Sequence, residues 1–167
     1  VRLGELAEAR ETAILRPVAS DWSAVTAAAR RVELAAGPGV VAWCQRMGEV
    51  PVGSAVISPA GGLAAEYLIH VSVRSDDYPV TREVVRRGLV NGIRRMREWG
   101  IERVALPPLG VGAGNLDAEE SADTMIPVLV EELGAMPGTS AVIVVESDYE
   151  YEVFERVLGA VRSRDVR

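Results

Sequence analysis

The chain has 167 residues, of which 49% are hydrophobic and 25% are charged, and its formal net charge is -6. This length supplies one hydrophobic core, and the composition is that of a folded globular domain rather than a disordered chain. The acidic balance disfavours a nucleic-acid partner, and all 18 basic residues are arginines, so no lysine nucleophile is available. A single cysteine and a single histidine exclude an internal disulfide and a metal site built from several such ligands.

No apolar run is long enough to span a bilayer, and no signal-peptide pattern opens the chain. We therefore expect a cytoplasmic protein that does not contact a membrane, and no cofactor is indicated. The start at Val1 suggests that a few native residues have been trimmed. Because no linker, repeat or low-complexity segment divides the chain, residues 1–167 are predicted to form a single domain.

The chain opens with two short apolar runs. Residues 1–6 and 12–18 are predicted to form strands. Proline cannot donate a hydrogen bond to a neighbouring strand, so Pro17 restricts the second strand to an edge position or places the proline at its end.

Two helices are predicted next. The first covers residues 22–36, which have helical spacing and many alanines, and either Ser20 or Asp21 is the expected cap. The glycines and proline at 37–39 interrupt the pattern. A second, shorter helix is predicted over 40–47.

The middle of the chain predicts two strands and a long helix. The β-rich runs 51–58 and 66–73 flank a turn signal at 59–62. Residues 79–100 have the spacing of an amphipathic helix, and Gly100 stands where a helix-terminating glycine is expected. The apolar positions of this helix form one stripe, which contains Val80, Val84, Val85, Leu89, Ile93 and Met96.

The last third of the chain repeats this alternation. A short buried strand is predicted over 101–109, and a helix entered near Asp117 follows it. The run 139–147 is nearly all apolar, as expected of a central strand covered on both faces, and 148–164 forms a closing amphipathic helix. Strands that alternate with long helices predict an α/β protein, here a three-layer α/β/α sandwich around a mixed, mostly parallel central sheet.

Two prolines and three glycines separate the strand at 101–109 from the next helix. Gly110, Gly112 and Gly114 lie at a strand exit, which is where open α/β sheets bind ligands. Glycines tolerate positive φ and let backbone N–H groups approach an anion, and the helix near Asp117 would add its positive end. The same glycines are also compatible with a tight connection that binds nothing.

The segments around this turn resemble the macro domain family in their order and spacing, from about Gly4 to Phe154. In that family a glycine-containing segment leads into an Ile-His strand, to which GEVPVGSAVISPAGGLAAEYLIHVSV is similar. A later Pro-x-Gly-x-Gly-x-Gly loop wraps the diphosphate of ADP-ribose, and LPPLGVGAGN resembles it. The resemblance therefore implies a macro-like fold and a pocket for ADP-ribose or a related nucleotide.

The first half departs from the family pattern. Gly4-Glu5-Leu6 stands where the family has Gly-Asp-Ile, so Glu5 keeps, on a longer arm, the carboxylate that holds the adenine amino group. The Asn-Ala-Ala-Asn motif is replaced by Arg16-Pro17-Val18-Ala19, and the first glycine loop by SDWSAVTAA. Within this replacement, Trp22 and Val25 are expected to fill space where phosphates would lie.

Several single residues have two interpretations. Arg16 would meet a phosphate if it points into the cleft, or form an exposed ion pair at the strand end. His70 is expected to be a satisfied structural histidine, and Cys44 a buried small hydrophobe. Tyr149 and Tyr151 follow the last strand, where the family often places an aromatic ring near the adenine or distal ribose. Each would stack on a base or pack against the last helix.

By the same resemblance, hydrolytic macro domains need a positioned water supported by an asparagine or a carboxylate. That carboxylate position falls near Thr26 or Ala27, and neither can act as a base, which leaves Asp21 as the nearest acidic candidate. No catalytic residue is therefore assigned. The predicted ligand-binding residues are Glu5, Gly110, Val111, Gly112, Ala113, Gly114 and Tyr149.

Three functions remain open. The first is a binding module for ADP-ribose or a related nucleotide, in which the glycine turn holds the diphosphate. The second is a macro fold that has lost nucleotide affinity and acts through protein contacts or as a homo-oligomer. The third is a hydrolase of ADP-ribosyl esters or phosphates, which the missing base disfavours most.

Overall fold

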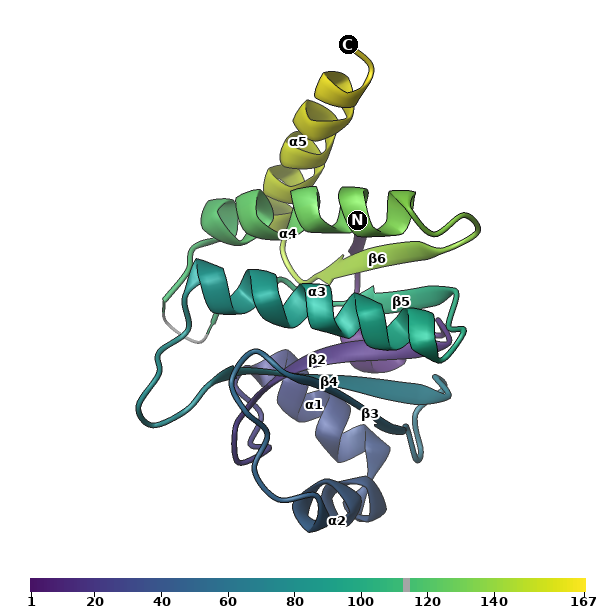
Figure 1. The fold of residues 1–167 in the computed structure, drawn as a ribbon, viewed down its shortest axis with the longest axis vertical. Helices are drawn as coiled ribbons and strands as arrows, with labels where there is room; N and C mark the ends of the chain where they lie inside the picture. The colour runs from purple at the N-terminus through teal and green to yellow at the C-terminus, as the bar shows by residue number, and fades with distance from the viewer. Residues whose placement is uncertain (113–114) are drawn as a thin grey trace.

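A computed structural model describes residues 1–112 and 115–167 (Figure 1). Its strands are β1 (Arg2–Leu3), β2 (Ala13–Ala19), β3 (Ala55–Pro59), β4 (Tyr67–Arg74), β5 (Arg103–Leu106) and β6 (Ser140–Val145). Its helices are the short 3-10 helix η1 (Leu6–Glu8) and the α-helices α1 (Ala27–Ala36), α2 (Pro38–Arg46), α3 (Arg82–Glu98), α4 (Ala118–Gly134) and α5 (Asp148–Asp165). Within the described part of the chain, no helix combines the length and the apolar character that a membrane crossing requires.

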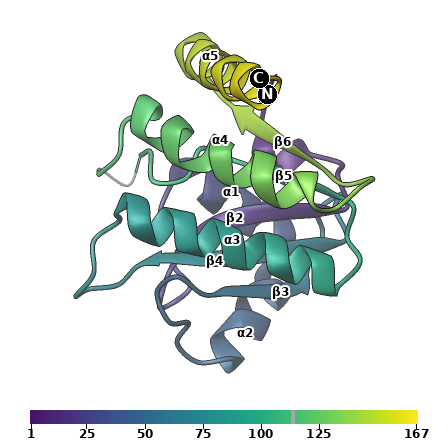
Figure 2. The same ribbon diagram turned by 45° about the horizontal axis from the view of Figure 1, so that its top comes forward.

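The strands form a six-stranded sheet in the order β1-β6-β5-β2-β4-β3. Neighbouring strands run parallel except β3 and β4, which are antiparallel. One core, on one face of the sheet, includes residues of α1 and α2, whereas the other includes residues of α3, α4 and α5 (Figures 1 and 2). This arrangement confirms the predicted α/β/α sandwich with a mixed, mostly parallel sheet.

Helix α3 follows its sequence pattern closely. The predicted stripe is buried throughout, at Val80, Val84, Val85, Leu89, Ile93 and Met96. On a different face of the helix, Arg87, Asn91 and Arg95 are spaced about one turn apart and donate hydrogen bonds to backbone carbonyls of segment 52–55. Helix α3 therefore anchors the entry to the edge strand β3 as well as packing on the sheet.

The helix predicted over 22–36 begins only at Ala27, and Thr26 is its cap. Neither predicted cap has that role, because Asp21 instead accepts hydrogen bonds from the backbone and side chain two residues later. Trp22 has a φ of 72°, which an α-helix does not allow. The prediction was wrong at this end because a side-chain turn at an aspartate competes with the helix for the backbone.

Two strand predictions also need correction. The run 51–58 becomes a strand only at Ala55, because Gly53, with a φ of 91°, belongs to a turn. Strand β6 is not central, since it is next to the edge and β1 pairs only with its Val144 and Val145. A run of apolar residues indicates burial but does not show how many neighbours a strand has.

Strand β2 is buried throughout and lies in the interior of the sheet. It pairs with β4 along its whole length but with β5 only at Ala13 and Ile14. Pro17 is therefore not on an edge strand, although it lies in the last three residues of β2. At that position β2 no longer pairs with β5, so the missing N–H removes no hydrogen bond to that neighbour.

A buried polar network connects β2, β4 and β3. Arg16 is 1% exposed, and its Nε donates a hydrogen bond to Nδ1 of His70 at 2.9 Å. Because Nδ1 accepts, the neutral ring carries its proton on Nε2, which lies 2.7 Å from Oγ of Ser58. Ser58 in turn donates to the Pro59 carbonyl at 3.0 Å. His70 is thus the satisfied structural histidine that was predicted, and Cys44 is buried as expected.

We predict that the fold loses stability below pH 6.5 because of His70. Burial, and then the nearby Arg16 guanidinium, hold the pKa of this ring well below its ordinary value of 6.5. Above pH 6.5 the His70 ring is unprotonated in both the folded and the unfolded state. Just below pH 6.5 only the unfolded state binds a proton at this ring. The free energy of unfolding therefore falls by up to about 1.4 kcal/mol per pH unit. Urea unfolding between about pH 7 and pH 5.5 measures this slope.

His70→Gln provides the control. His70 is the sole histidine of the chain, and ordinary carboxylates titrate at about pH 4, so the variant should lose the slope between about pH 5.5 and 6.5. The same slope in wild type and variant would contradict the prediction.

Candidate functional site

A hollow of about 180 Å³ lies at the carboxyl edge of the sheet, beyond β5 and β6. Its walls come from η1, the start of α1, the segment after β5, and the junction of β6 with α5. The lining residues are Leu6, Thr26, Ala27, Ala28, Pro107, Pro108, Val111, Gly112, Val144, Glu146 and Glu150. This carboxyl-edge pocket therefore lies where open α/β sheets commonly bind ligands.

The glycine turn forms one wall of the pocket. Gly110 and Gly112 have φ values of 86° and 82°, a conformation that residues with side chains disfavour. A Cβ on Gly110 would lie 2.6 Å from Cδ1 of Leu116, so the turn itself requires this glycine. A Cβ on Gly112 would meet only Cγ2 of Thr26, at 3.7 Å. That distance is an ordinary van der Waals contact, so Gly112 lies close beside the start of α1.

The N-terminus of α1 forms a second wall, which the sequence-based list of site residues missed. Thr26 caps the helix by accepting a hydrogen bond from Ala29 N at 3.1 Å, and Ala27 and Ala28 line the pocket. The first N–H groups of a helix lack intrahelical partners, and no acidic residue in this turn offsets the helix dipole. The available signal was a threonine followed by alanines without an acid, which a search for glycines does not detect.

Helix α4 does not bring its N-terminus to the pocket, although it directly follows the glycine turn. Asp117 caps α4 by accepting a hydrogen bond from Glu120 N at 2.8 Å. Glu119 forms an ion pair with Arg156, and Glu120 lies 3.4 Å from Arg82. The acidic side chains of its own first turn therefore compensate the positive end of α4.

Two carboxylates line the pocket, and a guanidinium of α1 connects one of them to a third carboxylate outside it. Nε of Arg31, on α1, lies 3.3 Å from Oε1 of Glu5, and Arg31 also forms an ion pair with Glu146. Glu146 and Glu150 line the pocket, whereas Glu5 is exposed and is connected to it through Arg31. These four side chains are net negative, so a bound anion is favoured beside the first turn of α1 and not beside Glu146 and Glu150.

Tyr149 lies away from the pocket. It is 61% exposed and lines a separate hollow with Glu119, Glu152, Val153 and Arg156. Because α5 begins at Asp148 and successive helical residues point about 100° apart, the next residue, Glu150, faces the pocket instead. Periodicity alone could not show which of the two faces the pocket.

The predicted glycine-loop residues are only partly placed by the structure. Val111 and Gly112 line the pocket, and Gly110 shapes the turn behind them. Ala113 and Gly114 lie outside the described residues. Across residues 1–112 and 115–167, no group of three or more His, Cys, Asp or Glu residues is arranged to hold a metal ion.

Trp22 and Val25 of the altered first loop do not line the pocket, although they were expected to fill it. Trp22 is buried against His70, with ring centroids 5.2 Å apart, and its Nε1 donates to the Gly48 carbonyl at 2.6 Å. Val25 is buried in the core that contains α3 and α4. Both interpretations of Arg16 were wrong, because the register of β2 and β4 sets it opposite His70 in the interior.

Comparison with known proteins relates this geometry to a family. The family model described as Macro domain matches residues 24–125. A protein of Aeropyrum pernix is 33% identical over 129 residues, which cover 73% of this chain and 65% of the relative. The DNA ADP-ribosyl glycohydrolase of Mycobacterium tuberculosis is 34% identical over 102 residues, which cover 60% of this chain and 28% of the relative. The matched region thus spans less than two thirds of either relative.

Solved structures agree with this result at the level of fold. The Oceanobacillus iheyensis macrodomain with ADP has a TM-score of 0.86 and 16% sequence identity, and the match covers 97% of this chain and 90% of that one. A mutant of the same macrodomain has been solved with ADPR. At this identity the likeness shows the shared fold alone. Because the family model matches more than half of the sequence, the chain belongs to the macro domain family.

Proposed function

We propose that this chain binds ADP-ribose or a related nucleotide and holds its diphosphate in the carboxyl-edge pocket, against Gly112 and the start of α1. The observation that carries the proposal is that these two features lie side by side in the lining of one pocket. Backbone N–H groups at a positive-φ glycine and in the first turn of a helix are both suited to phosphate oxygens. Neither depends on the side chains by which this sequence departs from the family pattern.

The charges around the pocket support one orientation of the nucleotide. The carboxylates of Glu146 and Glu150 would repel a phosphate but accept hydrogen bonds from an amino group or a hydroxyl. The adenine amino group would then lie towards Glu5, whose carboxylate is held by Arg31.

The size of the pocket limits how much of the nucleotide it encloses. It measures about 180 Å³, whereas pockets for drug-sized ligands measure roughly 300–1,000 Å³. We therefore place the diphosphate inside and the two nucleoside ends over the rim. The Oceanobacillus macrodomain structures with ADP and with ADPR support this choice of ligand, because both ligands contain a diphosphate joined to a nucleoside.

The main alternative is a macro fold that has lost nucleotide affinity. It was supported by the expectation that Trp22 and Val25 fill the space where the phosphates would lie. Trp22 is anchored on His70, and neither Trp22 nor Val25 lines the pocket. Nucleotide binding therefore remains the proposal.

We predict that ADP-ribose binds with micromolar affinity, about -8 kcal/mol, and that Gly112→Val abolishes binding. The branched side chain would fill the pocket beside Thr26, against which the diphosphate is proposed to lie. Calorimetric titration with ADP-ribose measures both affinities, and titrations with AMP and ADP show how much of the ligand is needed.

Gly138→Val is the matched control. Gly138 also has a positive φ, 84°, but it lies between α4 and β6 with nothing within 4 Å of the position that a Cβ would take. Both variants should lose about 1–2 kcal/mol of stability from backbone strain, yet Gly138→Val should bind like wild type. Unchanged affinity in Gly112→Val would remove the glycine turn from the proposed site.

We further predict no measurable turnover of a model ADP-ribosyl ester. The first turn of α1 contains no acidic residue that could activate a water. Asp21 is exposed, and hydrogen bonds from Ser23 lower the pKa of its carboxyl, which makes it a weaker base. Chromatography of released ADP-ribose provides the assay. Turnover that falls in Asp21→Ala would instead establish a hydrolase.

A further inference from the structure

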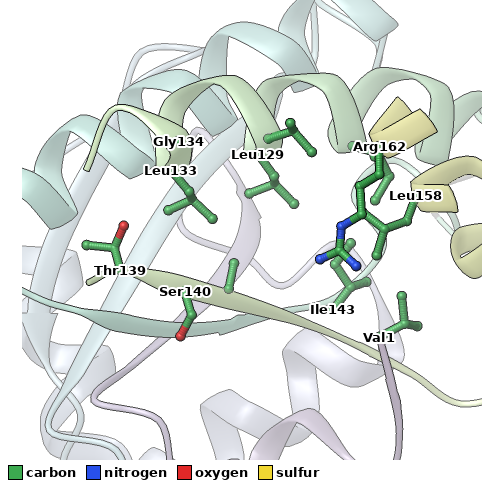
Figure 3. A pocket seen from close by; sticks show the side chains of 12 residues that line it. Val1, Leu129, Leu133, Gly134, Thr139, Ser140, Ile143, Leu158 and Arg162 are labelled. Atoms are coloured by element: carbon green, nitrogen blue, oxygen red, sulfur yellow. The ribbon is translucent and has the colours of Figure 1, made fainter. Parts of the chain in front are cut away.

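A second hollow lies beneath the projecting end of α5, between α4, α5 and β6 (Figure 3). It measures about 370 Å³, and most of its lining is apolar. The residues that matter here are Leu129 and Leu133 of α4, Ile143 of β6, and Leu158 and Arg162 of α5. Figure 1 shows that α5 continues past α4, and we call the hollow below it the α4–α5 groove.

The groove combines a free strand edge with a partly exposed helix face. Strand β1 pairs only with Val144 and Val145 of β6, so among the described strands the earlier part of β6 has β5 as its one neighbour. Helix α5 buries its first apolar residues, but the next ones, Val157, Leu158 and Val161, are only partly buried. Proteins usually cover a free strand edge that lies beside exposed apolar side chains.

The charges of α5 indicate what would cover this surface. The first half of the helix carries four carboxylates, on Asp148, Glu150, Glu152 and Glu155, against one arginine at 156. The second half carries arginines at 162 and 164 against one acid at 165. Two copies of α5 would therefore repel each other when parallel and attract each other when antiparallel.

Around Leu158 this complementarity becomes specific. Glu155 and Arg162 stand three residues before and four residues after Leu158, and so lie on the same face of the helix. When two α5 helices pack antiparallel about this point, Glu155 of each copy meets Arg162 of the other. Arg162 has no ion-pair partner among the described residues, and Glu155 has only the Val1 amino group, at 3.7 Å. A Cβ on Gly159 would have no atom within 4 Å, which leaves room for a partner.

We propose that the α4–α5 groove docks a second copy of this chain, through antiparallel α5 helices related by a two-fold axis. Leu158 of each copy enters the groove of the other, and two Glu155–Arg162 pairs flank the contact. Such an interface is the same on both sides, so the assembly closes at two copies. No residue lines both the groove and the carboxyl-edge pocket, so the dimer leaves the proposed nucleotide site free.

Sedimentation equilibrium of the purified chain tests the proposal, and wild type should be a dimer. Arg162→Glu sets like charges opposite each other at both pairs and should raise the dimer Kd by at least about tenfold. Glu155→Arg combined with Arg162→Glu returns opposite charges to both pairs and should restore the dimer. Arg164→Glu makes the same charge change on another face of α5, so it is the matched control and should leave the dimer intact.

A wild-type chain that stays monomeric at every concentration overturns the proposal. A dimer that Arg162→Glu leaves unchanged also overturns it, as does one that the exchanged pair fails to restore. Circular dichroism of each variant checks that α5 still folds. Leu158→Gln, at a partly buried position, should give a folded monomer by removing the apolar contact instead of the charge, and a dimer of unchanged strength would contradict the docking.

Discussion

The unequal pairing of β2 with its two neighbours determines where the candidate site of this protein lies. Strand β2 pairs with β4 as far as Ala19 but with β5 only at Ala13 and Ile14. Helix α1 begins beyond β2, and the glycine turn follows β5, so the two meet where the strands are no longer paired. Because parallel strands end at the same edge, segments far apart in the sequence converge there.

The hydrogen bond from Arg16 to His70 accounts for much of what is unusual in the first half of the chain. A buried guanidinium is costly, and Nη1 of Arg16 has no hydrogen-bond partner among the described residues. His70 offsets part of this cost, because its ring stays neutral and accepts a hydrogen bond from Nε of Arg16. The same ring packs against Trp22, whose side chain is buried between exposed neighbours, Asp21 and Ser23. The side chains of Arg16 and Trp22 therefore lie in the core, whereas Thr26, Ala27 and Ala28 line the pocket.

An acidic chain can still offer an anion site because the donors are local. The net charge is -6, but exposed charges more than about 8 Å away are largely screened at physiological salt. The start of α1 has no acid in its first turn, and the carboxylates of Glu5 and Glu146 are partly offset by Arg31. At α5 side-chain charges, rather than backbone donors, are important. Their separation along the helix favours antiparallel docking of a second copy.

The sequence by itself determined the type and order of the main elements, because the spacing of apolar residues and the choice of caps are local properties. The buried stripe of α3, the cap of α4 at Asp117 and the glycine turn at Gly110 and Gly112 all follow from neighbours within a few positions. The turn at Asp21 is also a local feature, but the helical spacing of the residues after it predicted a helix there instead.

Only the tertiary structure decided which of these features face one another. That Thr26 lies opposite the glycine turn, that Glu150 and not Tyr149 lines the pocket, and that Trp22 turns into the core were not accessible from local patterns. Each depends on strand register and on the layer that a side chain enters. Arg16 meets His70 across 54 residues of sequence, and no local pattern specifies a contact at that separation.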